Sequence, residues 1–86
     1  MSNIQTLNSI DPGQQARVLY LNSEGSMRRR LLDIGLVENA KVECVGKSPQ
    51  GDPRAFLIRG AVIAIRREDA QEIVISTDLG GINGVN

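Results

Sequence analysis

Apolar residues in this chain fall mostly in short runs, and runs of this kind predict β-strands. The run at residues 16–21, ARVLYL, has β-branched and aromatic members and suits a mostly buried strand. In a later run Val42 and Cys44 alternate with charged residues, with Val45 as an exception, which indicates one buried face. Two further runs, joined through a glycine-alanine pair at residues 60–61, are close enough to form a hairpin. The predicted strands are residues 16–21, 41–47, 55–59, 62–66 and 73–75.

The first predicted strand is followed by apolar residues at helical spacing. They fall at i, i+4 and i+7, which places them on one face of a helix. These residues are Met27, Leu31 and Ile34. Gly35 stands where a left-handed residue would end the helix, and Leu36 can make the hydrophobic contact that accompanies such an end. We therefore predict a helix over residues 24–34, with the side chain of Asn22 or Ser23 as its cap.

The two ends of the chain differ from its middle. Leu7 and Ile10 are isolated apolar residues ahead of the turn-forming residues 11–13, and we expect them to fold back onto the core. Residues 76–86 contain three glycines within a short span and predict a flexible tail. The sequence therefore predicts a single domain over residues 1–75, followed by this tail.

Together these elements predict a mainly β fold with a short inserted helix. About five short strands are expected, with the helix between the first two and one helical turn at residues 68–70. Short antiparallel strands in an open sheet expose their edges, and closure into a small barrel removes those edges. We therefore predict an SH3-like barrel. An OB-like barrel has the same strand count and is the alternative, although its helix usually lies between the third and fourth strands.

The composition changes this picture by excluding several kinds of site. The chain has 86 residues, no histidine and one cysteine, Cys44. Without histidine there is no serine–histidine or cysteine–histidine catalytic pair and no histidine zinc site. A single cysteine excludes an internal disulfide, a CxxC redox pair and a cysteine-based zinc or iron–sulfur site. We therefore predict a protein that is not an enzyme and that acts by binding.

The same composition bears on where the chain works. One free thiol without a disulfide fits a reducing compartment. The first residues, MSNIQTLNSID, lack the basic start and the apolar run of a secretory signal. No apolar stretch approaches the ~18–20 residues that a membrane helix needs. We therefore predict a cytoplasmic protein with no direct membrane insertion.

Charge is balanced over the whole chain and uneven along it. Ten basic and ten acidic residues give a formal net charge of +0, which argues against nucleic acid as the main partner. The aromatic residues, Tyr20 and Phe56, are too few to stack bases or to line a groove for proline-rich peptides. Basic residues nevertheless adjoin at positions 28–30 and 66–67, so we expect a local basic face toward a protein partner.

Three stretches of the chain stand out together for their order and spacing. They are Arg30-Leu31-Leu32-Asp33-Ile34-Gly35-Leu36, Gly51-Asp52-Pro53, and GAVIAIRREDA at residues 60–70. In this combination the chain resembles the FeoA family, small cytoplasmic proteins of bacterial ferrous iron uptake, from about Leu7 to Ile75. The family usually has a Pro-Gly pair after Leu36. This chain has Glu38-Asn39 there, and asparagine tolerates the positive φ of such a turn.

The resemblance implies an SH3-like barrel that works with FeoB, a membrane permease carrying a cytoplasmic GTPase domain. The implied function is that of a non-catalytic accessory protein that binds the cytoplasmic part of this permease and supports transport. Any GTP chemistry then belongs to the partner, because this chain lacks the GxxxxGK(S/T) phosphate loop. The alternative is a regulatory or nucleic-acid-binding small barrel that uses Arg66 and Arg67 beside the arginines of the predicted helix. An exposed sheet edge also leaves a weak homo-oligomer open.

For the docking surface we select the exposed side of the predicted helix and one loop. The residues are Arg28, Arg29, Leu32, Gly51, Asp52 and Pro53. Leu32 lies one residue off the apolar stripe, so it either offers apolar contact area or forms the edge of the core. The arginines either dock an acidic partner surface or form a solvated helix face, with Arg29 paired to Asp33 one turn away.

No residue of the chain is assigned to a metal or a cofactor. Cys44 lies on the inward side of its strand, so we expect it to be a buried small hydrophobic residue. The carboxylates that could offer oxygen ligands to iron show no distinctive spacing. They are Asp52, Glu68, Asp69 and Glu72. We therefore predict no cofactor and no stable Fe²⁺ site.

Overall fold

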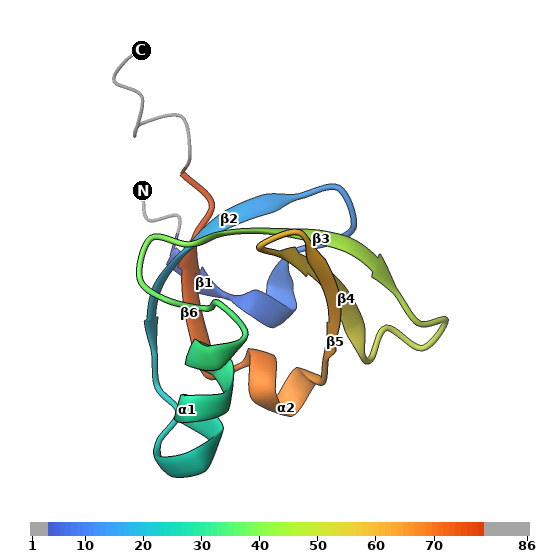
Figure 1. Cartoon of the computed structure of the whole chain (residues 1–86). Coiled ribbons are helices and arrows are strands. Elements are labelled where there is room, and N and C mark those ends of the chain that lie inside the picture. Colours follow the sequence, from blue (N-terminus) through green and yellow to red (C-terminus); the bar gives the residue numbers. More distant parts are fainter. Residues whose placement is uncertain (1–3, 79–86) are drawn as a thin grey trace.

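Six antiparallel strands form one sheet in the computed structural model, which describes residues 4–78 (Figure 1). The strands are β1 (Ile4–Thr6), β2 (Gln15–Leu21), β3 (Lys41–Lys47), β4 (Arg54–Ile58), β5 (Ala61–Ile65) and β6 (Ile73–Ser76). Their order in the sheet is β1-β6-β2-β3-β4-β5. The helices are the 3₁₀ turn η1 (Leu7–Ser9), α1 (Gly25–Asp33) and α2 (Arg67–Ala70). No helix within the described residues is both long and apolar enough to cross a membrane.

The mainly β fold with one inserted helix is confirmed, and β1 is an addition to it. The predicted strands correspond to β2 through β6. No hydrophobic pattern marks β1, because its one apolar side chain, Ile4, is 60% exposed. It forms by pairing with β6 from the far end of the chain, in register Ile4↔Ser76. Ser76, predicted to begin the tail, is therefore the last residue of β6, and residues 79–86 of that tail lie outside the described residues.

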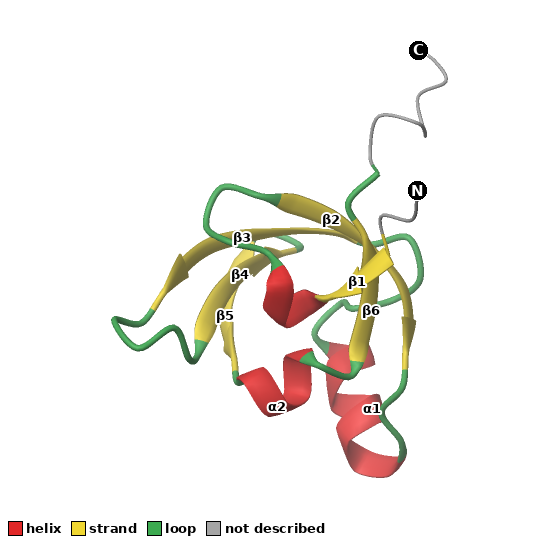
Figure 2. Ribbon diagram, turned by 180° about the vertical axis from the view of Figure 1, so that it is seen from behind, coloured by secondary structure: helices red, strands yellow, loops and turns green. Residues whose placement is uncertain are grey.

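The sheet curls around an apolar core, and α1 and α2 lie together at one end of it (Figure 2). The largest fully buried side chains are Leu7, Ile10, Val18, Leu36, Val42, Cys44, Phe56, Ile58, Ile73 and Ile75. Leu7 and Ile10 fold back onto this core from the N-terminal segment, as predicted. Their burial fixes η1 against the inner face of the sheet.

Two irregularities bend the longest strands. β2 pairs with both β3 and β6, and its register with β6 shifts between Val18 and Tyr20. In β3 the register with β4 shifts between Cys44 and Gly46, which leaves Val45 between them. Val45 is exposed, which accounts for the apolar residue that breaks the alternation of this strand. Such bulges bend a strand and increase its twist, so they allow a small sheet to curl strongly.

The end of α1 follows the prediction. Gly35 has a φ of +110°, and its N–H donates to the Leu32 carbonyl at 3.0 Å. The Leu36 N–H donates to the Leu31 carbonyl at 3.0 Å. This pair of bonds is a Schellman motif, which needs a left-handed residue at its centre. The side chain of Arg59 lies over Gly35, where a Cβ atom would come within 2.8 Å of Arg59 Cδ.

The start of α1 does not follow the prediction. The cap position is Glu24, and no side chain makes a capping hydrogen bond there. The predicted cap by Asn22 or Ser23 is therefore wrong. The helix begins at Gly25, which has a φ of +63°, so Ser23 does not directly precede the first turn. The Ser23 hydroxyl is instead buried, without a hydrogen-bond partner among residues 4–78.

The turn of the β4–β5 hairpin lies one residue earlier than predicted. It consists of residues 59–60, because Ala61 already pairs with Ile58 as the first residue of β5. Arg59 has a φ of +53° and Gly60 a φ of +83°. Two positive φ values in a two-residue loop define a type I′ turn, whose twist matches that of the flanking strands.

Asn39 adopts a left-handed conformation in the turn after α1, as predicted. It has a φ of +72°, and the Ala40 N–H donates to the Val37 carbonyl at 2.9 Å across the turn. Its side chain adds a contact that glycine could not make, since Oδ1 accepts a hydrogen bond from Arg17 Nη1 at 2.9 Å. The turn is thereby tied to β2.

Candidate functional site

The docking residues predicted on α1 lie on its outer face. Arg28 and Arg29 are exposed, and Leu32 is half-buried. With Gly25 and Asp33 they line a shallow open hollow. Leu32 also packs against the core, so it forms the edge of the core and still offers apolar area to this hollow. The two interpretations of Leu32, as the edge of the core and as apolar contact area, therefore both apply.

The two arginines of this hollow differ in what they contact. Arg28 Nη1 donates to the Leu21 carbonyl at 3.4 Å, so part of its guanidinium holds α1 to the end of β2. The pair between Arg29 and Asp33, which belonged to the alternative of a solvated helix face, does not form: both ion pairs within residues 4–78 involve Asp11. The guanidinium of Arg29 is in no ion pair within this part of the chain, and arginine donors bind carboxylates well.

The loop at residues 48–53 is closed by hydrogen bonds of Ser48. Its N–H donates to the Pro53 carbonyl at 3.1 Å, and its carbonyl accepts from the Gly51 N–H at 2.8 Å. Its hydroxyl accepts from the Asp52 N–H at 3.0 Å and donates to the Asp52 carbonyl at 2.8 Å. Gly51 has a φ of +84°, and the Asp52–Pro53 peptide bond is cis. The Gly51-Asp52-Pro53 stretch is thus a closely hydrogen-bonded turn between β3 and β4.

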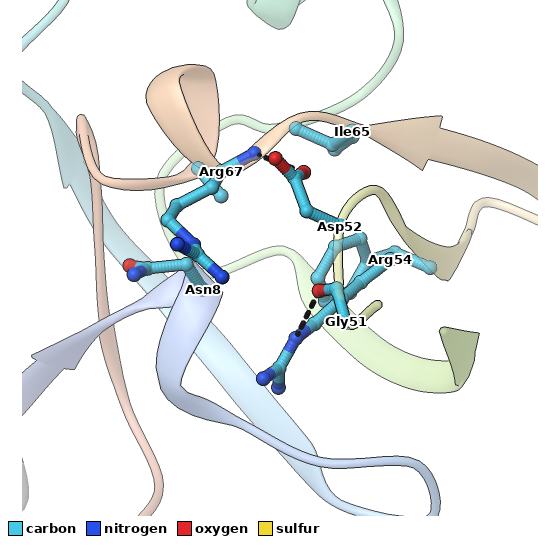
Figure 3. A pocket seen from close by; sticks show the side chains of 8 residues that line it. Asn8, Gly51, Asp52, Arg54, Ile65 and Arg67 are labelled. Carbon is cyan, nitrogen blue, oxygen red and sulfur yellow. Dashed lines mark hydrogen bonds between the residues drawn. The ribbon is translucent and has the colours of Figure 1, made fainter. Parts of the chain in front are cut away.

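The carboxylate of Asp52 caps α2 (Figure 3). Its Oδ1 accepts a hydrogen bond from the N–H of Arg67, the first residue of α2, at 2.8 Å. The residue at the cap position, Arg66, makes no side-chain capping bond of its own. The first N–H groups of a helix need acceptors, and here a distant loop supplies one. Asp52 therefore has a structural role, and one of its oxygens is already used.

Arg54, which was not among the predicted site residues, extends these connections to the N-terminal segment. Its Nε donates to the Gly51 carbonyl at 3.4 Å. Its Nη1 donates to the Ile10 carbonyl and lies 3.1 Å from Asp11 Oδ1. Its position directly after Gly-Asp-Pro was visible in the sequence, but its partner Ile10 lies 44 residues earlier. No local pattern reports a contact over that separation.

A hollow lies where this loop, η1 and α2 meet (Figure 3). It is lined by Asn8, Gly51, Asp52, Arg54, Phe56, Ile65, Arg67 and Ala70. The side chain of Arg67 lies beside Asn8, while Arg54 and Asp52 bond to backbone groups of the lining. The hydrogen bonds of Asp52 and Arg54 connect the loop at this hollow to α2 and to the N-terminal segment.

The structure does not bring the two predicted groups of docking residues together. In both views α1 and the loop between β3 and β4 lie on opposite sides of the molecule (Figures 1 and 2). The hollows beside them share no residue. The helix residues therefore form one surface, and Gly51-Asp52-Pro53 belongs to another.

The residues considered for metal binding lie in different environments. Cys44 is fully buried, as predicted, and its Sγ lies 3.5 Å from the Gly46 carbonyl oxygen. Asp52 is engaged in capping α2. Within residues 4–78 no three or more histidine, cysteine or acidic side chains form a group that could hold a metal ion.

The basic residues of the nucleic-acid alternative are divided between surfaces. Arg67 lines the hollow at Asp52, whereas Arg28 and Arg29 line the one on α1. Of the two aromatic residues, Phe56 is fully buried, so Tyr20 alone is exposed for stacking. Recognition of single-stranded nucleic acid uses successive stacked bases along a basic groove, which this arrangement does not support.

The comparisons of this chain with known proteins agree on one family. The sequence model of the FeoA domain matches residues 5–77. The chain is 30% identical over 69 residues to the "Fe(2+) transport protein A/Fe(2+) transporter FeoB fusion protein" of Porphyromonas gingivalis. That alignment covers 80% of this chain and 8% of the fusion protein. The chain thus spans a small part of this relative.

Solved structures agree with this likeness. The NMR structure of a FeoA-like protein from Clostridium acetobutylicum has a TM-score of 0.81 and 29% identity, and the match covers 93% of each chain. The crystal structure of Stenotrophomonas maltophilia FeoA complexed with zinc, described as a procaryotic SH3 domain protein, has a TM-score of 0.75 and 25% identity. That match covers 84% of this chain and 89% of the other. The predicted SH3-like barrel is confirmed.

Proposed function

Because the chain belongs to the FeoA family, we propose that it is a non-catalytic accessory protein of bacterial ferrous iron uptake. It binds the cytoplasmic part of an FeoB-type membrane transporter and supports transport from the cytoplasmic side. The observation that carries the proposal is the P. gingivalis fusion protein, which joins an FeoA part and FeoB in one chain. A covalent link raises the effective concentration of two domains, to the millimolar range for short linkers, and so favours even a weak contact.

The outer face of α1 supplies the docking surface in this proposal. It combines the free donors of Arg29, the partly engaged guanidinium of Arg28 and the apolar area of Leu32. Arginine is enriched at protein interfaces because its planar fork pairs with carboxylates while its stem packs against apolar groups. A surface of this composition suits a partner that presents acidic groups around an apolar contact.

The Gly51-Asp52-Pro53 loop remains in the proposal as a second contact. Since it lies on the side of the molecule away from α1, a partner has to extend across the barrel to reach both. The internal hydrogen bonds of the loop favour binding, because a segment that is already ordered loses less conformational entropy when a partner docks.

A pull-down with the cytoplasmic domain of the FeoB-type transporter encoded in the same genome tests the proposal. We expect the wild-type chain to be retained and the Arg28→Glu/Leu32→Asp double variant to be lost. The reversed charge repels an acidic partner, and the new carboxylate replaces the apolar contact. Wild-type retention of the double variant would reject the α1 surface.

The controls separate binding from folding. Lys41→Glu reverses one exposed charge on β3, outside the α1 hollow, and is expected to leave retention unchanged. Because Leu32 also packs on the core, thermal unfolding of each variant must show a folded protein at the temperature of the assay. If the wild-type chain itself is not retained at low salt, the proposed partner is wrong.

A further inference from the structure

The barrel has an open seam along β5. The sheet order begins with β1 and ends with β5, and no ladder within residues 4–78 joins these two edge strands. On the β5 side of the seam a groove separates the strand from α1. Its lining includes Met27, Arg30, Ile34, Ile63, Ala64 and Asp69. Most of these side chains are apolar, with one basic and one acidic group among them.

The backbone along the outer edge of β5 is unpaired. The residues that flank the two-residue turn form a hydrogen-bonded pair, and such pairs alternate with non-bonded pairs along an antiparallel ladder. Ala61, Ile63 and Ile65 therefore direct their N–H and C=O groups toward β4. Val62 and Ala64 direct theirs away from it, and these groups make no backbone hydrogen bond to another described element. Two donors and two acceptors thus line the edge at the spacing of a strand.

Nothing in the sequence of β5 protects this edge from another strand. Natural edge strands usually carry lysine, proline, inward charges or a bulge that prevents pairing. β5 reads AVIAI, without charge or proline, and its register with β4 runs without a shift. Val62 is 64% exposed, so even the outward side chains are apolar. An edge of this kind is a template for an added strand.

The charges around the seam indicate what kind of strand fits. Arg30 lines the groove, Arg59 lies just before β5 and Arg66 just after it. All three are exposed, and none is in an ion pair within the described part of the chain. Pairing of two copies through antiparallel β5 strands would bring Arg59 of one copy close to Arg66 of the other. This like-charge contact disfavours a second copy and favours an acidic segment.

We propose that the β5 seam binds an extended segment of a protein partner, which adds to the sheet as a strand beside β5. The backbone of the segment pairs with Val62 and Ala64. Its apolar side chains occupy the groove beside α1, and its acidic side chains face the arginines at both ends of β5. This is strand addition, in which main-chain hydrogen bonds give affinity and side-chain positions give specificity. It is a second surface, separate from the outer hollow of α1, and does not depend on the proposed transporter.

Binding of synthetic peptides to the full chain tests the proposal. The probe is an eight-residue peptide that alternates glutamate and valine, and the readout is the amide spectrum of the ¹⁵N-labelled protein. We expect chemical-shift changes centred on Val62 and Ala64. A lysine–valine peptide of the same pattern is expected to bind at least about tenfold more weakly, because its charges repel the arginines. A glutamate–valine peptide N-methylated at every residue is expected not to bind, since neither of its edges keeps a backbone donor.

Two variants make the test specific. Ala64→Pro removes one unpaired N–H and leaves the β4 ladder intact, as proline is tolerated on edge strands, so binding is expected to fall at least about tenfold. Ala64→Ser keeps that N–H and is the matched control. Arg30→Glu is expected to weaken binding, while Arg29→Glu, on the outer hollow of the same helix, is not.

Three results would overturn the proposal. The first is equal binding of the acidic and basic peptides. The second is unchanged binding by a folded Ala64→Pro variant, with folding checked by circular dichroism. The third is a dependence of the Val62 and Ala64 shifts on protein concentration without peptide, together with a dimer in sedimentation, which would assign the edge to a second copy of the chain.

Discussion

Gly35 meets two requirements at a single residue. Its φ of +110° lies where side chains are strained, and its Cα hydrogens lie against the stem of Arg59. The first requirement comes from the Schellman end of α1 and is visible in the sequence. The second comes from the turn of a hairpin that follows more than twenty residues later, so it is visible only in the fold.

The Gly35→Ala variant is therefore expected to be less stable. A non-glycine residue in a sparsely populated backbone region costs about 1–3 kcal/mol in the free energy of unfolding. For a domain of this size each kcal/mol lowers Tm by about 4–8 °C. Calorimetry or urea unfolding measures the loss, and an unchanged stability would contradict the backbone argument.

Gly13→Ala is the matched control for the contact with Arg59. Gly13 has a φ of +96°, and a Cβ atom there would meet nothing within 4 Å. Its substitution therefore reports the backbone cost alone. We expect Gly35→Ala to be the more destabilising of the two, and the excess to shrink when Arg59 is also replaced by alanine. An equal loss at both glycines would show that Arg59 moves aside freely.

At the scale of elements, α2 is too short to be stable without help from outside. It has four residues, and the acceptor for its first N–H is the carboxylate of Asp52 from another loop. Short helices gain most of their stability from tertiary contacts. The loop between β3 and β4 therefore acts as part of the helix.

Asp52→Ala is expected to loosen α2. Loss of a helix-capping acceptor costs about 0.5–2 kcal/mol in stability. Hydrogen exchange at the Arg67 amide is expected to accelerate, because that group loses its acceptor. Asp52→Asn keeps an oxygen in the same place and is the matched control, with a change of a few tenths of a kcal/mol at most. Equal protection of the Arg67 amide in wild type and Asp52→Ala would refute the capping role.

The elements that could be predicted are those with a local signal. Alternation and apolar runs locate β2 to β6, the i, i+4, i+7 stripe locates α1, and the glycine at its end locates its last turn. β1 was missed because Ile4 is exposed and its pairing partner, Ser76, is at the other end of the chain. The cap of α1 was misplaced because Gly25 takes a left-handed conformation at the helix start, and the sequence does not report that.

The candidate site was predictable only in part, because some of its contacts join residues that are far apart in the sequence. Exposed arginines and a leucine off the apolar stripe mark the outer face of α1 from the helical period alone. The Gly51-Asp52-Pro53 stretch was recognisable as a loop, but the bond from Asp52 to the start of α2 spans 15 residues. The sequence gives the chemical type of each side chain, whereas the distance between two side chains depends on the fold.

At the scale of the whole molecule, acidic and basic side chains are equal in number but have different roles. The acidic groups include Asp11, which binds Lys47 and Arg54, and Asp52, which caps α2. Arginines around α1 and β5 stay exposed without an ion pair in the described region. A chain with a formal net charge of +0 thereby presents basic surfaces without a general attraction to polyanions.

We expect the chain to form no stable complex with Fe²⁺. It has no histidine, its one cysteine is buried, and no group of three or more ligand side chains exists within residues 4–78. Anaerobic calorimetric titration of Fe²⁺ into the protein is expected to show no saturable heat at micromolar concentration. A 1:1 complex with micromolar affinity would contradict this prediction.

The position of β6 in the sheet sets the order in which the chain can fold. This strand lies between β1 and β2, the first two, so until Ser76 has been synthesised β1 has no neighbour in the sheet and β2 has only β3. The β3–β4–β5 meander needs only local contacts and can form earlier on the ribosome, because pairings between distant segments are slow to close. β1 thus waits, unpaired, for β6, and truncation before β6 would remove the neighbour of β1 and one of the two neighbours of β2 in the sheet.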